Sequence, residues 1–175
     1  MNEIKIQFKP VHNLNFLCAL WLCLILIYPI QGSADDDITR HGDAYIIYLP
    51  SELEFDEVVR RLHSEIQGEN WQVVSEMNIG EAVKDFGKHI DNRVISVCKT
   101  QYLAKAIEED HFISLIIPCR FTVFRESTEK GRIVVGFYDP VAEADGLNLK
   151  QAQAAQIAAN ELKAILYRIA ENYQE

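Results

Sequence analysis

The sequence is short of positive charge, and this shortage excludes two classes of partner. Its 17 lysines and arginines stand against 26 acidic residues, so the net charge is −9 at pH 7. Nucleic-acid binding requires a basic surface, and anionic membranes attract basic segments. We therefore expect neither nucleic acid nor a membrane surface as a partner of the mature protein. The acidity itself is typical of a domain kept soluble by its net charge.

Motifs of enzymes and metalloproteins are also missing. The glycines stand apart from one another, so they form no phosphate loop or dinucleotide fingerprint, and no hydrolase elbow occurs. The histidines after residue 34 show no paired ligand spacing, and the cysteines form no CxxC motif. The sequence therefore indicates neither catalysis nor a metal or other cofactor.

The first 34 residues predict a signal peptide. Lys5 and Lys9 make its start weakly basic, residues 14–30 are strongly apolar, and Gly32-Ser33-Ala34 supplies small residues before a cleavage point after Ala34. We expect an exported, periplasmic protein. The alternative is an uncleaved segment that tethers the domain to the membrane, because the apolar run reaches the short limit for spanning a bilayer.

Cleavage removes Cys18 and Cys23, which leaves Cys98 and Cys119 in the mature chain. Three states remain open for this pair. An oxidising compartment favours a disulfide, and two separate buried thiols are equally compatible with the pattern. A functional thiol is the third state, because Lys99 and Arg120 follow the two cysteines and positive charge stabilises a thiolate.

The mature chain predicts a flexible leader over residues 35–43 and one α+β domain over residues 44–175. Apolar residues that alternate or run together indicate about five strands, at residues 45–49, 71–77, 93–100, 112–123 and 133–137. Trp71, Val73 and Met77 are expected on one face of the second strand. Pro118 cannot donate a backbone hydrogen bond, so it predicts a bulge or an edge position in the fourth strand.

Helices are predicted between these strands and at the end of the chain. Ser51 and Glu54 form a capping box for a helix that ends at Gly68. Asn78 caps a short helix that Gly87 stops, and residues 103–107 fit a third. The long final helix begins at Asn148, and its alanines allow close packing on its own sheet or on a second copy. They are at positions 152, 154, 155, 158 and 159.

The element order, with Val97-Cys98 and Ile117-Pro118-Cys119-Arg120 at this separation, resembles the domain-of-unknown-function 302 family. The resemblance covers Tyr45 to about Pro140, and the Pro-Cys-Arg signature is its most specific part. It implies a TATA-binding-protein-like fold, a curved antiparallel sheet with helices on one side, and a homodimer. It implies no activity. Lys99-Thr100 departs from the family pattern, in which asparagine and proline are frequent after this cysteine.

Three functional hypotheses follow. The first is a non-catalytic homodimer that binds a small molecule or a partner in the concavity of its sheet, where Arg120 pairs with an anion. Cys98, Cys119 and His111 are the other candidate binding residues; His111 separates an acidic run from the strand that carries Cys119. The second hypothesis is a thiol redox or sulfur-handling protein that uses Cys98 and Cys119. The third is a purely structural assembly module.

Overall fold

The computed structural model describes residues 38–127, 131–149 and 153–173. The predicted signal peptide and Ala152 lie outside these residues. None of the described helices combines the length and the hydropathy needed to cross a membrane.

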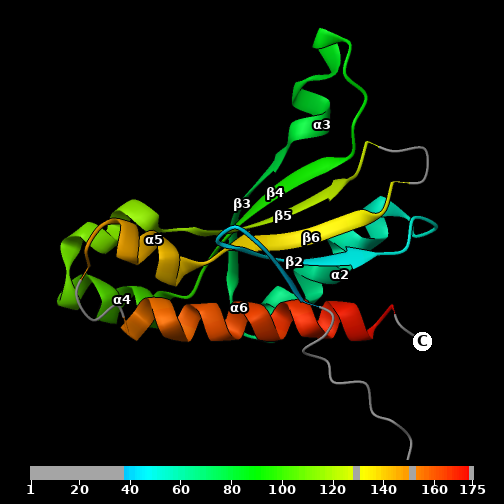
Figure 1. The fold of residues 1–175 in the computed structure, drawn as a ribbon. Coiled ribbons are helices and arrows are strands. Elements are labelled where there is room, and N and C mark those ends of the chain that lie inside the picture. The colour runs from blue at the N-terminus through cyan, green and yellow to red at the C-terminus, as the bar shows by residue number, and fades with distance from the viewer. Residues whose placement is uncertain (1–37, 128–130, 150–152, 174–175) are drawn as a thin grey trace, which may run out of the picture. The chain divides into compact units, whose positions relative to one another are not determined.

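Six strands form one antiparallel sheet in the order β1-β2-β6-β5-β4-β3 (Figure 1). The predicted α+β class with an antiparallel sheet is thus confirmed, with six strands instead of about five. The strands are β1 (Thr39–His41), β2 (Ala44–Leu49), β3 (Gln72–Asn78), β4 (Asn92–Cys98), β5 (Cys119–Arg125) and β6 (Ile133–Tyr138).

The additional strand, β1, lies in the segment predicted to be a flexible leader. It pairs with β2, with Arg40 opposite Tyr45. The Arg40 guanidinium lies 4.3 Å from the centre of the Tyr45 ring and 3.1 Å from an oxygen of Asp139. These contacts attach residues 39–41 to the edge of the sheet.

Two helices, α2 (Phe55–Gly68) and α6 (Gln153–Glu171), cover one face of the sheet, which we call the inner face (Figure 1). The predicted helix that ends at Gly68 is confirmed as α2, and Val58, Leu62 and Ile66, one turn apart, are fully buried. The predicted capping box is wrong: α2 begins after Glu54 without a side-chain cap. The inner face of the sheet consists of Ile47, Leu49, Ile95, Val97, Phe121, Val123, Ile133, Val135 and Phe137.

A bulge in β3 changes the face to which its side chains point. The register shifts between Val73 and Ser75, so Val73 faces Val97 on the inner face whereas Met77 lies on the opposite, open face and is 54% exposed. The predicted single face for Trp71, Val73 and Met77 is therefore wrong.

Residues 112–118 are not part of a strand, which corrects the predicted strand at 112–123. Residues His111–Ile116 form a 3-10 helix, η4, in which the Asp110 carboxylate accepts a hydrogen bond from the Phe112 N–H at 2.8 Å. Ile113 and Ile116 are buried, and this spacing of three fits a 3-10 helix. Pro118 precedes β5, a central strand, so the predicted bulge or edge strand is absent there.

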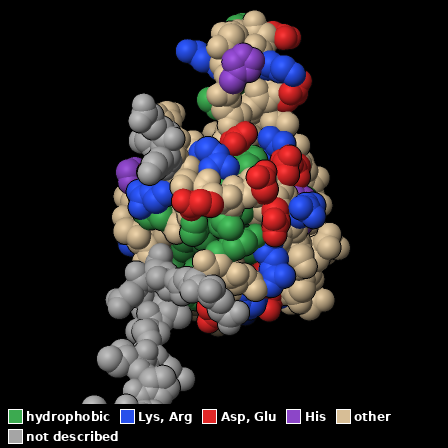
Figure 2. All heavy atoms as spheres, turned by 90° about the vertical axis from the view of Figure 1, so that its right-hand side faces the viewer, with side chains coloured by type: hydrophobic (Ala, Val, Ile, Leu, Met, Phe, Trp, Pro, Cys, Tyr) green, Lys and Arg blue, Asp and Glu red, His purple; other side chains and the backbone are tan. Residues whose placement is uncertain are grey.

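An arm, residues 79–91, projects from the β3–β4 connection (Figure 1). It contains α3 (Ile79–Ala82) and the 3-10 helix η3 (Lys84–Phe86). The predicted cap is confirmed, because Asn78 Oδ1 accepts from the Glu81 N–H at 2.9 Å, and Gly87 ends the arm's helices with a φ of 70°. Figure 2 shows the arm standing clear of the body with basic, acidic and histidine side chains near its tip. Phe86 is 82% exposed there.

Three short helices close one end of the domain. They are α4 (Thr100–Glu109), η4 and α5 (Pro140–Gly146), and they pack around the first half of α6. The sequence interpretation missed α5, whose N-terminus Asp139 caps by accepting from the Val141 N–H at 3.0 Å. Asn148 has a φ of 55°, which is not the extended backbone of a helix N-cap, so the cap predicted there is wrong.

Candidate functional site

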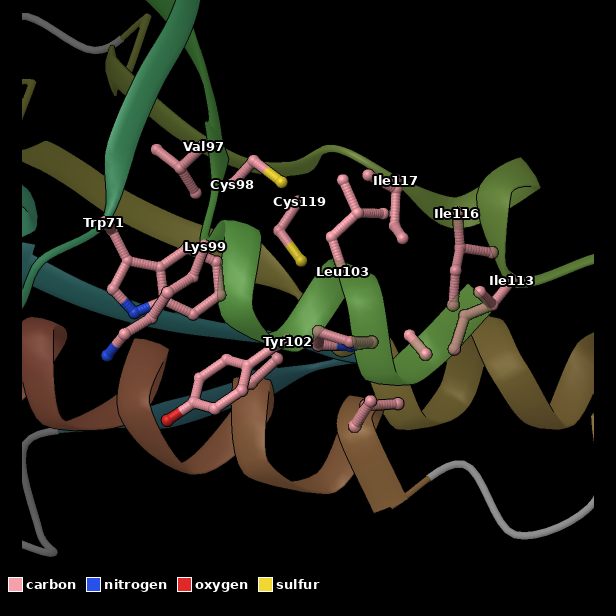
Figure 3. Close-up of a pocket in the computed structure, with 15 residues that line it drawn as sticks. Trp71, Val97, Cys98, Lys99, Tyr102, Leu103, Ile113, Ile116, Ile117 and Cys119 are labelled. Atoms are coloured by element: carbon pink, nitrogen blue, oxygen red, sulfur yellow. The ribbon is translucent and has the colours of Figure 1, made fainter. Parts of the chain in front are cut away.

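A cavity of about 50 Å³ lies where β4 ends and β5 begins, next to α4, η4 and α6 (Figure 3). Its wall is almost entirely apolar. Val97 and Cys119 contribute from the sheet, and Leu103 contributes from α4. The alanines of α6 complete the wall with small side chains, and this is why a space remains. These alanines, at positions 154, 155 and 158, are buried within the chain itself.

Both cysteines border this cavity, and both are free thiols. Cys119 is the first residue of β5 and pairs with Val97, so it lies on the inner face of the sheet. Cys98 is the last residue of β4 and, by strand alternation, belongs to the opposite face. Figure 3 shows the two sulfur atoms near Leu103. The structure therefore brings the two predicted cysteines to one site without joining them.

The surroundings of the two thiols keep them protonated. Burial, followed by the nearby Glu143 and Cys98, raises the pKa of Cys119 to about 12, and Arg120 only partly opposes this. Burial also raises the pKa of Cys98, against a hydrogen bond from the Lys99 backbone. Since the thiolate is the nucleophile and the metal ligand, neither side chain is activated for such chemistry at neutral pH.

Four polar side chains join at one side of the cavity, and we call this group the Glu161 clamp. Glu161, on α6, accepts hydrogen bonds from Trp71 Nε1 and Lys99 Nζ, each at 2.8 Å, and from the Tyr102 hydroxyl. Lys99 also donates to the Glu69 backbone carbonyl at 2.9 Å. Trp71, Lys99 and Tyr102 line the cavity, whereas Glu161 stands behind them.

Charge within the clamp is balanced. The Lys99 and Glu161 side chains are only 10% and 25% exposed, and each has the other as its counter-ion. Burial acts to raise the pKa of Glu161, but the hydrogen bonds from Lys99, Tyr102 and Trp71 outweigh it and hold this pKa below its ordinary value. Figure 3 shows the Lys99 amine and the Tyr102 hydroxyl pointing away from the two sulfur atoms. The cavity thus receives the apolar parts of these side chains.

Arg120 and His111 lie elsewhere. Arg120 projects from the open face and pairs with Glu143 on α5 at 2.9 Å, with its side chain 49% exposed. His111 is the exposed first residue of η4. Neither residue borders the cavity. The site in the described part of the chain is therefore centred on the two cysteines and the clamp, at the end of the sheet.

The sequence interpretation missed Trp71, Tyr102 and Glu161 as site residues. One signal for Glu161 was available: it stands at helical spacing with Ala158 and Ile165, both buried, so a carboxylate falls on the apolar stripe of α6. Trp71 and Glu161 are 90 positions apart in sequence, and no local pattern connects them. Among the described residues, no group of three or more His, Cys, Asp or Glu side chains is placed to hold a metal ion.

These features define an α+β domain with one helix-covered sheet face and an apolar cavity at the end of the sheet. The chain belongs to the family described as Domain of unknown function DUF302, whose model matches residues 47–172. It is similar to a crystal structure of an uncharacterized conserved DUF302 protein from Bacillus stearothermophilus, with a TM-score of 0.65 and 21% sequence identity. That match covers 74% of this chain and 99% of the other. The comparison with curated proteins finds no significant match.

Proposed function

We propose that this protein is an exported, non-catalytic homodimer whose domain binds a small, uncharged, apolar molecule in the cavity between β4, α4 and α6. The observation that carries the proposal is the apolar cavity itself, a space kept open by alanines at three positions of α6. Native interiors are usually packed without voids larger than a water molecule. A space of this kind, bordered by two thiols, is therefore a candidate ligand site.

The chemistry of the wall favours an uncharged ligand. A charged group inside would lose its hydration without gaining a counter-ion, because Lys99 and Glu161 already neutralise each other. The volume favours a small ligand: an apolar cavity of about 150 Å³ holds benzene, and this one is near 50 Å³. A few heavy atoms fill it as it stands, and a larger molecule requires α4 to move.

Xenon is a suitable probe, because it is small, apolar and bound by dry cavities. We expect xenon to shift the NMR signals of Leu103 and Ile113 in the wild-type protein. Ala155→Val places two further methyl groups in the space and abolishes the shifts. Ala104→Val, on the exposed side of α4, is the matched control and retains them. Absence of xenon shifts in the wild-type protein overturns the ligand proposal.

The thiol alternative has one observation in its favour, since Cys98 and Cys119 border the same cavity. The raised pKa of Cys119 counts against it, because a redox or sulfur-carrying thiol requires the thiolate. Rapid reaction of either thiol in the folded protein would favour this alternative over ligand binding.

The open face of the sheet is our candidate for the dimer contact. Three large apolar or aromatic side chains lie on it with substantial exposure: Tyr48 at 38%, Tyr138 at 46% and Met77 at 54%. The alanines of α6, which we considered for this role, are buried within the chain. A second copy that packs its own open face here would remove these side chains from water. Each Å² of apolar surface buried in this way contributes ~25 cal/mol to the free energy of association.

The oligomeric state tests this contact. We expect a dimer by analytical ultracentrifugation and at least about a tenfold weaker association for Met77→Glu, because a carboxylate would be buried without a partner. Leu115→Glu is the control, since Leu115 is 66% exposed on η4, away from the sheet. A monomeric wild-type protein overturns the dimer. A dimer that takes up no xenon would support the assembly-module hypothesis.

A further inference from the structure

We propose that the Glu161 clamp is a latch that holds α4 closed over the cavity, and that ligand entry requires the Tyr102–Glu161 contact to break. This inference rests on the proposed function, because it assigns the regulation of the same cavity. It identifies Glu161 as a residue that controls access without contacting the ligand.

The clamp connects three parts of the fold to α6. Trp71 stands directly before β3, Lys99 follows β4, and Tyr102 lies in the first turn of α4. All three donate to the two oxygens of one carboxylate, which is shared by no other described side chain. Removing this carboxylate leaves Trp71 and Tyr102 without this acceptor and leaves Lys99 with the Glu69 carbonyl alone. The clamp is therefore a single point on which several contacts depend.

Helix α4 is the wall best placed to move. Its residues Leu103 and Ala106 line the cavity, while Ala104, Lys105 and Glu108 on its other side are exposed. Tyr102 ties the beginning of α4 to α6 through its hydroxyl. Among the described residues, one other side-chain hydrogen bond joins α4 to α6. Lys105 donates it to Gln153 at the surface. Exposed hydrogen bonds of this kind add little stability.

The ring and the hydroxyl group of Tyr102 make different contacts. Its ring packs edge-on against Trp71, with 6.3 Å between the ring centres, and lies 5.0 Å from the Lys99 amine. Its hydroxyl contacts Glu161. Replacement by phenylalanine removes the hydroxyl and retains the ring, so it opens the latch without removing a wall of the cavity.

Cys119 reports on opening, because it borders the cavity and is only partly exposed in the folded protein. Transient opening exposes such a thiol to reagents at a rate that follows the opening equilibrium. The experiment is alkylation of the folded full-length mature protein with iodoacetamide, with the modified peptide of Cys119 quantified by mass spectrometry over time.

We expect Tyr102→Phe and Glu161→Gln to accelerate alkylation of Cys119 by on the order of tenfold, the change that loss of one hydrogen bond makes in an opening equilibrium. The control is Glu65→Gln, which weakens the ion pairs of Glu65 with Arg61 and Arg168 at 3.1 Å and 2.9 Å; Glu65 does not line the cavity. It should leave the rate unchanged. Thermal unfolding of each variant verifies that it is folded.

Two results overturn the latch. One is an unchanged rate in Tyr102→Phe, which retains the ring and the packing. The other is an equal acceleration in Glu65→Gln, which would mean general loosening of the domain. Xenon binding to the same wild-type sample separates this inference from the proposed function. A fast Tyr102→Phe variant with no xenon bound to the wild type supports the latch and rejects the ligand.

Discussion

Val97 lies directly opposite Cys119 across the β4–β5 pair, and this register sends the side chains of Cys98 and Cys119 to opposite faces of the sheet. A disulfide requires Cβ atoms about 3.5–4.5 Å apart and pointing toward each other. Neighbouring strands do not offer this geometry to a diagonal pair on opposite faces. The two thiols are accordingly unbonded in the structure.

The first prediction concerns the redox state of these cysteines. We expect both to be alkylated after denaturation without any reductant, because the register keeps them apart. In the folded protein Cys119 should react slowly at pH 8, since burial raises its pKa to about 12. Intact-mass measurement under both conditions checks this. Two cysteines that react only after reduction would demonstrate a disulfide and a different register at the ends of β4 and β5.

Acid should weaken the clamp. The pKa of Glu161 is below its ordinary value of 4.5 in the folded protein. The stability that this carboxylate contributes is therefore fully present above pH 4.5 and is lost as the pH falls through the lower, folded-state pKa. The Tyr102 hydroxyl, whose pKa is raised by its hydrogen bond to Glu161, stays neutral in this range.

The measurement is urea unfolding of the wild type and Glu161→Gln between pH 3 and pH 7. We expect the variant to be less stable at pH 7 by about 1–3 kcal/mol, the loss of hydrogen bonds to a charged group. The difference should shrink as the pH falls below 4.5, because the contribution of the carboxylate is lost progressively there. A difference that stays constant with pH would show that Glu161 acts through packing alone.

Gly136 tests the packing of β2 against β6. A Cβ atom at this position would come within 2.7 Å of both the Tyr45 carbonyl oxygen and the Ile46 Cγ2 atom. We expect Gly136→Ala to lower the free energy of unfolding by about 1–3 kcal/mol, as overpacking does. Chemical denaturation followed by circular dichroism measures it.

Gly68→Ala is the matched control for Gly136→Ala. Gly68 is the last residue of α2, and a Cβ atom there would meet nothing within 4 Å. Alanine should stabilise by up to ~1 kcal/mol, because it is the better helix former. Equal effects of the two substitutions would contradict the close approach at Gly136.

Arg120 should be dispensable for binding in the cavity. Its partner, Glu143, is 2.9 Å away, but the arginine side chain is 49% exposed, so we expect Arg120→Ala to change stability by less than about 1 kcal/mol. Xenon shifts should be those of the wild type, because Arg120 does not border the cavity. Loss of the shifts on this substitution would return the site to Arg120, where the sequence hypothesis placed it.

Several elements were predictable from sequence because their signals are local. The stripe of Val58, Leu62 and Ile66 identifies α2 from residues one turn apart, and Asn78 caps its helix through a contact three residues away. The strand predicted at 133–137 is likewise confirmed as β6, which spans Ile133–Tyr138. In each case the decisive interactions lie within one segment.

Other elements were mispredicted because two local readings compete. The odd-numbered residues from Ile113 to Val123 alternate as a strand does, yet Ile113 and Ile116 also fit a 3-10 helix, and only packing against α4 and α6 decides between them. The strand β1 carries no apolar pattern, and its place depends on contacts of Arg40 with Tyr45 in the next strand and with Asp139, which is 99 positions away.

The sequence by itself determined the α+β class, the periodic helices, the central strands and the resemblance to the DUF302 family, because these follow from patterns within short segments. Only the tertiary structure decided where the site lies. The Glu161 clamp joins positions 71, 99, 102 and 161, and the register of β4 and β5 separates two thiols that the sequence allowed to be bonded. Both are long-range pairings, which form only when segments far apart in the chain pack together.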